Sequence, residues 1–433
     1  MKIRITPGPL SGRIRAIASK SQAHRLLICA AFADGPTDIL CRELSADIEA
    51  TAHCLEALGC GVSYDKAAGI YHVVPCPAAS PITLDVGESG STLRFLLPVV
   101  CALGLRTRIM MHGRLPERPL SPLWEELMAH GAVLGRNPDG SVETAGRLTG
   151  SSFTIAANIS SQFISGLLFA LPLIREEQAA GMSSAENDGR KDRPEAPGSL
   201  RLRLTGQAES VHYIRMTIDA LKLFRIEAKW NEEKSEILIP AGAAYRTPGR
   251  LEVEGDWSNG AFWHCARAIG SAALEVTGLA PDSSQGDRAV LDMIRRIRTD
   301  RPGHRVEIDA RDVPDLVPVL SVLAASVCGE TVFTHAERLR IKESDRIRAS
   351  AQLLHSLGGR AEETADGLIV YGTGRLAGGS VDSCNDHRIA MSAAVASLLC
   401  EKEVTILGAE AVRKSYPRFW EDFEALGGYI RRE

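Results

Sequence analysis

A helix followed by a turn and a short strand recurs six times along this chain of 433 residues. In each copy apolar side chains recur at intervals of three and four residues, as on the buried face of an amphipathic helix. The six helical segments are 48–58, 123–130, 216–224, 290–297, 347–357 and 420–426, and glycines follow four of them. One copy cannot bury its apolar face alone, so the copies are expected to pack together. The repeat predicts an α/β fold of two domains with three copies each.

One interval in the repeat is longer than the others. Gly59 and Gly131 lie about 70 residues apart, and so do Gly358 and Gly427, whereas the interval after Gly131 is about 94 residues. The excess falls in the polar segment 176–199, which is rich in Gly, Pro and Ser. Such a segment cannot bury enough apolar surface to order itself, so we expect a surface insertion.

The composition excludes several classes of protein. A net charge of -4 argues against a nucleic-acid-binding surface, since such domains are usually basic. The first residues contain no apolar core of a secretory signal. The apolar runs Phe95–Leu105 and Ile164–Ile174 are interrupted by prolines and are too short to span a bilayer. We therefore expect a cytoplasmic protein that binds neither nucleic acid nor membrane.

The ten cysteines are scattered, without a CxxC motif or a Cys/His cluster at metal-ligand spacing. Thiols in a cytoplasmic protein are normally reduced and often buried. The sequence therefore predicts free cysteines and no metal site.

The most highly charged stretch is Arg340–Arg346, directly before one of the repeated helices. Ser344 or the residue before it is the expected N-cap of that helix. A helix N-terminus flanked by Lys342 and Arg346 could hold an anion, while Glu343 is available for proton transfer. The alternative is a solvated cap whose charges pair with one another.

Polar clusters at predicted helix starts continue this pattern in the N-terminal half. Lys20, Ser21 and Arg25 combine two cations and a hydroxyl, which suits a phosphate group, although the spacing is not that of a Walker A loop. A glycine-containing turn at 85–94 could bring backbone N–H groups close to a ligand. Arg114 lies in a stiff loop with Arg118 between prolines; this loop could bind an anion or pair with surface carboxylates.

Neutral donors and further clusters complete the set. Ser160, Ser161 and Gln162 stand before an apolar helix and suit a hydroxylated ring or a phosphate, although Ser160 could be only an N-cap. In the C-terminal half, Asp315, the segment 385–388 and the segment 414–417 occupy similar positions. Polar groups at helix starts in both halves are what a cleft between two domains needs to bind a multiply anionic ligand.

Seven motifs in the same order make the chain similar to the EPSP synthase family. They are Lys20-Ser21-x-x-His24-Arg25, Glu88–Arg94, Arg114-x-x-Glu117-Arg118-Pro119, Ser160-Ser161-Gln162, Val253–Asp256, Arg340–Arg346 and Asn385–Arg388, and Lys414–Pro417 fits as well. The resemblance implies a two-domain inside-out α/β barrel with three βαβαββ repeats in each domain. One domain would comprise 1–18 and 251–433, and the other 19–250 with the insertion 176–199.

The resemblance also implies a reaction: transfer of the enolpyruvyl group of phosphoenolpyruvate to the 5-hydroxyl of shikimate 3-phosphate, with release of phosphate. The residues that it implies for shikimate 3-phosphate are Lys20, Ser21, Arg25, Ser160, Ser161, Gln162, Ser210, Tyr213, Asp315, Arg338 and Lys342. Those for phosphoenolpyruvate are Lys20, Gly90, Arg114, Gln162, Glu343, Arg346, His387, Arg388 and Lys414.

The catalytic roles implied are specific. Glu343 would act at the methylene carbon as acid and then as base, Asp315 would accept the hydroxyl proton, and Lys20 would stabilise developing charge. Lys20 or Lys414 could share the proton transfers. The chemistry needs no cofactor or metal, and the expected partners are the two substrates of a monomeric enzyme.

The sequence differs from the family pattern at one of the predicted site residues, and two alternative functions remain. Arg338 stands where many family members have Asn. A transferase acting on UDP-N-acetylglucosamine would be expected to carry a reactive Cys in the loop around Arg114, and this loop has none. A non-catalytic RNA-end-binding protein of related fold would be basic and would not need Glu343 and Asp315 beside the cations.

Overall fold

The computed structural model describes residues 1–76, 80–174, 198–298 and 303–433. The chain divides into two compact units, each with its own packed interior. Unit 1 comprises Met1–Ser19 and Glu254–Glu433, and unit 2 comprises Lys20–Val253. The expected insertion 176–199 falls outside the described residues except at its end, where Ser199 is the first residue of strand β11 and is therefore not part of a surface insertion.

Unit 2 contains three four-stranded sheets in the described part of the chain. Their strands, in order across each sheet, are β14 (Arg250–Glu252), β3 (Thr37–Leu40), β5 (Ile70–Val74) and β4 (Gly61–Asp65); β6 (Ile82–Asp85), β7 (Thr107–Met110), β9 (Val142–Gly146) and β8 (Ala132–Arg136); and β10 (Ser152–Ala156), β11 (Ser199–Thr205), β13 (Glu236–Pro240) and β12 (Lys229–Asn231). In each sheet the first two strands are parallel and the other pairs are antiparallel.

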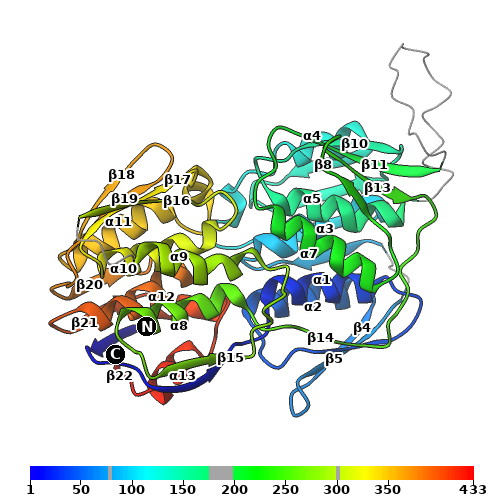
Figure 1. Ribbon diagram of the computed structural model, residues 1–433. Coiled ribbons are helices and arrows are strands. Elements are labelled where there is room, and N and C mark those ends of the chain that lie inside the picture. The colour runs from blue at the N-terminus through cyan, green and yellow to red at the C-terminus, as the bar shows by residue number, and fades with distance from the viewer. Residues whose placement is uncertain (77–79, 175–197, 299–302) are drawn as a thin grey trace. The chain divides into compact units, whose positions relative to one another are not determined.

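The helices of unit 2 lie inside these sheets, as Figure 1 shows for α3, α5 and α7 beneath β10 and β11. The helices are α1 (Lys20–Ala31), α2 (Ala46–Ala57), α3 (Gly90–Leu103), α4 (Leu123–Ala129), α5 (Ser161–Ala170) and α7 (Val211–Leu223). Helices α3 and α5 are buried on almost all sides, which explains why their sequences are continuously apolar and not amphipathic.

Unit 1 repeats the same strand pattern twice and adds a shorter sheet. Its strands are β20 (Gly379–Asp382), β21 (Val404–Leu407), β1 (Lys2–Thr6) and β22 (Tyr429–Arg432); β16 (His304–Asp309), β17 (Gly329–Thr334), β19 (Leu368–Gly372) and β18 (Arg360–Glu363); and the pair β15 (Leu274–Thr277) and β2 (Gly12–Arg15). Its helices are α8 (Trp257–Ile269), α9 (Val290–Ile297), α10 (Val317–Ala325), α11 (Arg346–Ser356), α12 (His387–Ala396) and α13 (Phe419–Ala425). Helices α10 and α12 are wholly buried and pack together in the core of the unit.

Four copies of the predicted repeat form as expected. Helices α2, α4, α11 and α13 each end just before a glycine with positive φ and lead into a strand, at Gly59, Gly131, Gly358 and Gly427. Glycine adopts this left-handed conformation without the steric cost that a side chain brings.

Of the other two copies, the helix predicted at 290–297 forms as α9, whereas the copy at α7 differs from the prediction. After α7 the left-handed residue is Arg225, and not the glycine that follows the four helices above. The next strand, β12, begins only at Lys229, because Ile226 donates its N–H back to the Leu221 carbonyl. Helix α9 leads into β16, which pairs with β17 and begins the next repeat. The described residues therefore form five four-stranded repeats and one two-stranded sheet, and none of these sheets closes on itself.

Two further predictions can be compared with the structure. All ten cysteines are free, and seven of them are buried. Within the described residues, no helix has the length and apolar character needed to cross a membrane.

Candidate active site

In unit 1 the charged stretch Arg340–Arg346 runs from the end of the short 3-10 helix η5 (Glu337–Ile341) to the first residue of α11. The predicted N-cap was wrong: Asp345 caps α11, and its carboxylate accepts the N–H of Arg348 at 3.1 Å. Ser344 is buried and its hydroxyl donates instead to Asp386 Oδ2 at 3.0 Å. The cap carboxylate also places Arg346 at the first helical position, pointing into the unit.

Arg346 is the centre of a buried charge cluster. Its guanidinium lies 2.8 Å from Asp386, 2.6 Å from Asp315 and 3.8 Å from Glu343, and only 3% of its side chain is exposed. Burial alone would lower the pKa of Arg346, but the three carboxylates outweigh it and raise the pKa above its usual value. Burial would likewise raise the pKa of Asp386, yet Arg346 holds it below normal. Both groups are therefore charged at neutral pH.

Glu343 and His387 form a hydrogen-bonded pair in this cluster. Glu343 Oε2 lies 2.9 Å from His387 Nδ1, and the His387 side chain is almost fully buried. This distance is that of a hydrogen bond in which the imidazole and the carboxyl group face each other directly.

Asp315 stands in the 3-10 helix η4 (Pro314–Leu316), just before α10, between two arginines. One of its oxygens accepts from Arg346, and the other lies 3.2 Å from Arg388 Nη2. Arg388 also donates to the Asp315 backbone carbonyl at 3.1 Å and to Ser258 Oγ at 2.7 Å. These contacts fix the orientations of Asp315 and Arg388 relative to each other.

The same region gathers three groups of the kind that bind metals. Glu343, Asp386 and His387 bring one ligand atom each within 4.8 Å of one another. Sequence spacing did not indicate this group, because Glu343 lies far along the chain from the other two. Arg346 already donates to both Asp386 oxygens at 2.8 and 3.3 Å, so a cation on Asp386 would have to displace the guanidinium. In the structure, the Asp386 carboxylate therefore serves as the partner of Arg346.

Three other predicted cations of unit 1 lie on neighbouring segments. Lys342 follows η5 and is partly exposed. Arg338 donates to the Arg311 carbonyl at 2.8 Å. Lys414 ends the 3-10 helix η7 (Ala409–Lys414) and donates to the Asn385 carbonyl at 2.7 Å, next to the start of α12.

In unit 2 the first cluster forms on α1. Arg25 is buried and donates to Thr217 Oγ1 at 2.9 Å and to the carbonyl of Ser21 at 2.6 Å. Its guanidinium also lies over the ring of Tyr213. Burial lowers the pKa of Arg25 to about 10, so it remains charged. Lys20, at the start of α1, pairs with Asp47 at 2.8 Å.

A second cluster surrounds Gly90 at the start of α3. A Cβ at this position would lie 2.6 Å from Arg118 Nη1 and 2.7 Å from Arg94 Nη1, so only glycine lets both guanidinium groups approach the helix start. Arg94 donates to Gln162 Oε1 at 2.9 Å, and Gln162 donates to Ser91 Oγ at 2.9 Å. Burial, together with Arg118, lowers the pKa of Arg94 well below its usual value. Two adjacent cations at a helix N-terminus favour an anion there.

The remaining predicted residues of unit 2 have local roles in the structure. Ser160 is the N-cap of α5 and accepts from Gln162 N, and Ser161 is the first residue of that helix. Ser210 caps α7 in a left-handed conformation. Arg114 is exposed and lies 3.7 Å from Glu117. The loop therefore directs Arg118 toward Gly90.

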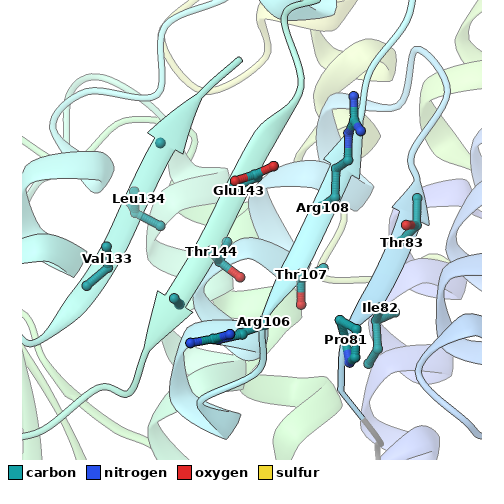
Figure 2. Close-up of a pocket in the computed structure, with 12 residues that line it drawn as sticks. Pro81, Ile82, Thr83, Arg106, Thr107, Arg108, Val133, Leu134, Glu143 and Thr144 are labelled. Atoms are coloured by element: carbon teal, nitrogen blue, oxygen red, sulfur yellow. The ribbon is translucent and has the colours of Figure 1, made fainter.

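A cavity of about 540 Å³ in unit 2 contains none of the predicted residues. It lies over the sheet β6-β7-β9-β8, where Figure 2 shows Arg106, Arg108 and Glu143 among its lining side chains. Arg108 is paired with Asp139 on this exposed sheet face. We do not assign this cavity to the candidate active site.

Each unit thus has charged groups collected at its helix starts. Unit 1 brings together Glu343, Arg346, His387, Arg388 and Asp315. Four further residues were not among the predicted site residues but contact one of them within their own unit: Asp47, Arg94 and Arg118 in unit 2 and Asp386 in unit 1. Three of the four lie inside the quoted motifs, but only their contacts distinguish them from neighbouring charged residues.

Comparison with known proteins supports one family. The model of the family "EPSP synthase (3-phosphoshikimate 1-carboxyvinyltransferase)" matches residues 5–187 and 195–423. A 3-phosphoshikimate 1-carboxyvinyltransferase from Clostridium perfringens is 37% identical, with 100% of both chains covered, and one from Clostridium acetobutylicum is 37% identical, with 99% of this chain and 98% of the relative covered. The solved EPSP synthase from Acinetobacter baumannii superimposes with a TM-score of 0.77 at 23% identity over 100% of both chains. The chain belongs to the EPSP synthase family.

Proposed function

We propose that the protein transfers the enolpyruvyl group of phosphoenolpyruvate to the 5-hydroxyl of shikimate 3-phosphate and releases phosphate. In the chain itself, the observation that carries this proposal is the buried cluster of Arg346 and Arg388 with Glu343 and Asp315. Two cations and two oriented carboxyl groups supply anion binding and proton transfer together. A protein that only bound an RNA end would not need the carboxyl groups.

Both substrates are anions, so the residues proposed to bind them are largely cationic or hydrogen-bond donors. For shikimate 3-phosphate these are Lys20, Ser21, Arg25, Ser160, Ser161, Gln162, Ser210, Tyr213, Asp315, Arg338 and Lys342. For phosphoenolpyruvate they are Lys20, Gly90, Arg114, Gln162, Glu343, Arg346, His387, Arg388 and Lys414. To these we add Arg94 and Arg118, since both guanidinium groups converge on Gly90.

The reaction proceeds by addition and elimination. The 5-hydroxyl oxygen forms a bond to C2 of phosphoenolpyruvate, its proton passes to Asp315, and Glu343 delivers a proton to the methylene carbon. In the second step Glu343 takes a proton back from the resulting methyl group, the C–O bond to phosphate breaks, and the proton held by Asp315 leaves with the phosphate. Lys20 offsets the charge that develops as the intermediate forms. No atom changes its oxidation state overall, so proton transfer and charge stabilisation suffice without a cofactor.

The test is phosphate release with each candidate acceptor. Phosphoenolpyruvate and shikimate 3-phosphate should release phosphate, and phosphoenolpyruvate with UDP-N-acetylglucosamine should not. Release with the sugar nucleotide alone would replace the proposal with its nearest alternative. No release with either acceptor would overturn an enzymatic role.

We further propose that the enzyme acts as a monomer in the cytoplasm, because each unit has its own core and the reaction uses small soluble anions. Sedimentation velocity at micromolar concentration should give a single species of about 46.6 kDa. A dimer that persists on dilution would contradict this.

A further inference from the structure

His24 belongs to the first of the quoted motifs but is not among the residues proposed to bind a substrate. It lies on α1 and is almost fully buried in unit 2. A polar side chain in such an interior needs hydrogen-bond partners, because an unpaired polar group there costs free energy. The partner of His24 is a hydroxyl group of the next helix: its Nδ1 lies 2.7 Å from Thr51 Oγ1 on α2.

The hydrogen bonding continues from α2 to the start of α3. Thr51 Oγ1 lies 2.7 Å from Thr92 Oγ1, and Thr92 Oγ1 donates to Ser89 Oγ at 2.7 Å. Ser89 is the N-cap of α3, and its hydroxyl also accepts the N–H of Thr92 at 3.2 Å. All four side chains are buried. A continuous chain of hydrogen bonds therefore runs from α1 to the residue directly before Gly90.

The number of available hydrogens fixes the direction of this chain. A hydroxyl group has one hydrogen to donate. Thr92 donates its hydrogen to Ser89, so Thr51 must donate to Thr92. His24 must then donate to Thr51 from Nδ1, and among the described residues no hydrogen-bond partner reaches its Nε2. The ring is therefore expected in the tautomer that carries its hydrogen on Nδ1.

The surroundings of His24 keep the ring neutral. Burial, and after it the charges of Lys20 and Arg25, lower the pKa of His24 well below its usual range. A neutral imidazole carries one N–H, which the chain uses.

Helix α1 is also held by bonds that do not involve His24. One turn nearer the start of both helices, Lys20 pairs with Asp47 of α2 at 2.8 Å. On another side of α1, Arg25 donates to Thr217 Oγ1 of α7 and to the Tyr213 carbonyl. Loss of the His24 bond should therefore leave α1 in place and disturb mainly the start of α3.

We propose that His24 is a positioning residue: through the two threonines it fixes the N-cap of α3. The cap is followed by Gly90, on which the guanidinium groups of Arg94 and Arg118 converge. Apolar packing between helices is non-directional, whereas a fully connected hydrogen-bond chain permits one arrangement of the helix start. The inference rests on the proposed function for the identity of the anion bound there, phosphoenolpyruvate. His24 touches no substrate in this account.

The experiment compares His24→Leu, Thr51→Val and the double variant with the wild type. We expect each single variant to raise KM for phosphoenolpyruvate about tenfold, because a displaced helix start misplaces its cations. The values of kcat and KM for shikimate 3-phosphate should change less than about threefold. The double variant should lose no more than the weaker single one, because both substitutions break one chain.

Two further substitutions separate positioning from general damage. His24→Asn places an amide N–H where the imidazole Nδ1–H was, so it should stay within about threefold of the wild type. His53→Leu makes the same change as His24→Leu on the exposed side of α2 and is the matched control. An Asn variant as impaired as His24→Leu, additive losses in the double variant, or equal changes in both KM values would overturn the inference.

The tautomer of His24 can be measured in the wild type without any kinetics. In NMR spectra of protein with ¹⁵N-labelled histidines, the signals of this ring are those missing from His24→Asn. They should show the neutral form with its hydrogen on Nδ1. A hydrogen on Nε2 would reverse the chain and overturn the inference.

Failure of the proposed function would be visible separately, as a wild type that turns over neither substrate. In that case, calorimetric titration of inorganic phosphate still tests the positioning of the α3 start. Weaker binding by His24→Leu and Thr51→Val, with normal binding by His24→Asn, would support it. Phosphate binding that is equal in all proteins, or absent from the wild type, would overturn it.

Discussion

Arg346 and Asp386 form an ion pair that is almost completely removed from water, with the Asp386 side chain wholly buried. Two buried charges are tolerated only while each satisfies the other, so removing one leaves the other uncompensated. Ser344 donates to the same carboxylate, and the backbone N–H of Arg388 donates to Asp386 as its helix cap. Asp386 thus joins the two charged helix starts of unit 1.

Asp386→Asn is expected to reduce the free energy of unfolding by about 3–5 kcal/mol, because Arg346 loses its best charge partner. Urea denaturation followed by circular dichroism measures this. Asp382→Asn changes an exposed carboxylate nearby and serves as the control. Equal stability of the two variants would show that Asp386 does not compensate Arg346.

The same pair predicts the pH dependence of stability. The pKa of Asp386 is lowered in the folded protein, so its contribution is complete above the unfolded value of about 3.9 and is lost as the pH falls through the folded pKa. The stability difference between wild type and Asp386→Asn should therefore shrink in acid. A difference that grows below pH 4 would contradict the assignment.

Glu343→Gln keeps the shape of the side chain but removes its proton chemistry. We expect kcat to fall by about 10²–10⁴ with both KM values changed less than about threefold. Glu337→Gln, on the exposed side of η5, is the matched control. Retention of full kcat in Glu343→Gln would remove Glu343 from the proton-transfer steps.

At the scale of single residues, the sequence predicted which types of side chain the candidate site contains better than it predicted which individual residues supply them. Arg114 and Arg118 lie in one proline-containing loop, and either could be expected to bind an anion. Only the path of the chain shows that Arg118 reaches Gly90 while Arg114 is exposed beside Glu117. Asp47 carried no local signal, because its partner Lys20 is distant in sequence.

At the scale of elements, many of the candidate site residues lie at helix starts, and at the start of α3 two guanidinium groups crowd Gly90. Gly90→Ala would place a methyl group within 2.7 Å of both guanidinium groups, so Arg94 and Arg118 must move. We expect KM for phosphoenolpyruvate to rise at least tenfold while KM for shikimate 3-phosphate changes little. Gly135→Ala, with no neighbouring atom within 4 Å, is the control. Equal kinetics in both variants would show that the two arginines do not bind this substrate.

Helices and their C-terminal ends could be predicted from the sequence where helical periodicity was followed by a glycine, as at Gly59 and Gly427. The prediction failed where another residue supplied the left-handed turn, as Arg225 does after α7. The prediction of a helix at 290–297 was confirmed by α9, but periodicity could not show that the strand after it belongs to the next repeat. Strand pairing over long sequence separations decides such cases, and periodicity carries no information about it.

At the scale of the whole molecule, the two units differ in how the chain builds them. Unit 2 is the continuous segment Lys20–Val253, whereas unit 1 needs both ends of the chain, since β1 pairs with β21 and β22. The six-fold repeat predicted two domains, but it could not show that the N-terminal strand belongs with the C-terminal half.

A fragment spanning Lys20–Val253 should therefore unfold cooperatively on its own and bind shikimate 3-phosphate through Arg25 and its neighbours, without any turnover. Calorimetry of the fragment with this ligand, beside the same titration of the fragment carrying Arg25→Ala, tests the expectation. Binding that is unchanged in the Arg25→Ala fragment would contradict the role given to α1.

The most direct measurement of the central claim follows both substrates and both products by ³¹P NMR during one reaction. Phosphoenolpyruvate and shikimate 3-phosphate should disappear together, with one inorganic phosphate and one enolpyruvyl shikimate 3-phosphate formed for each pair consumed. Phosphate release without a change in the shikimate 3-phosphate signal would contradict enolpyruvyl transfer, and so would transfer to UDP-N-acetylglucosamine under the same conditions.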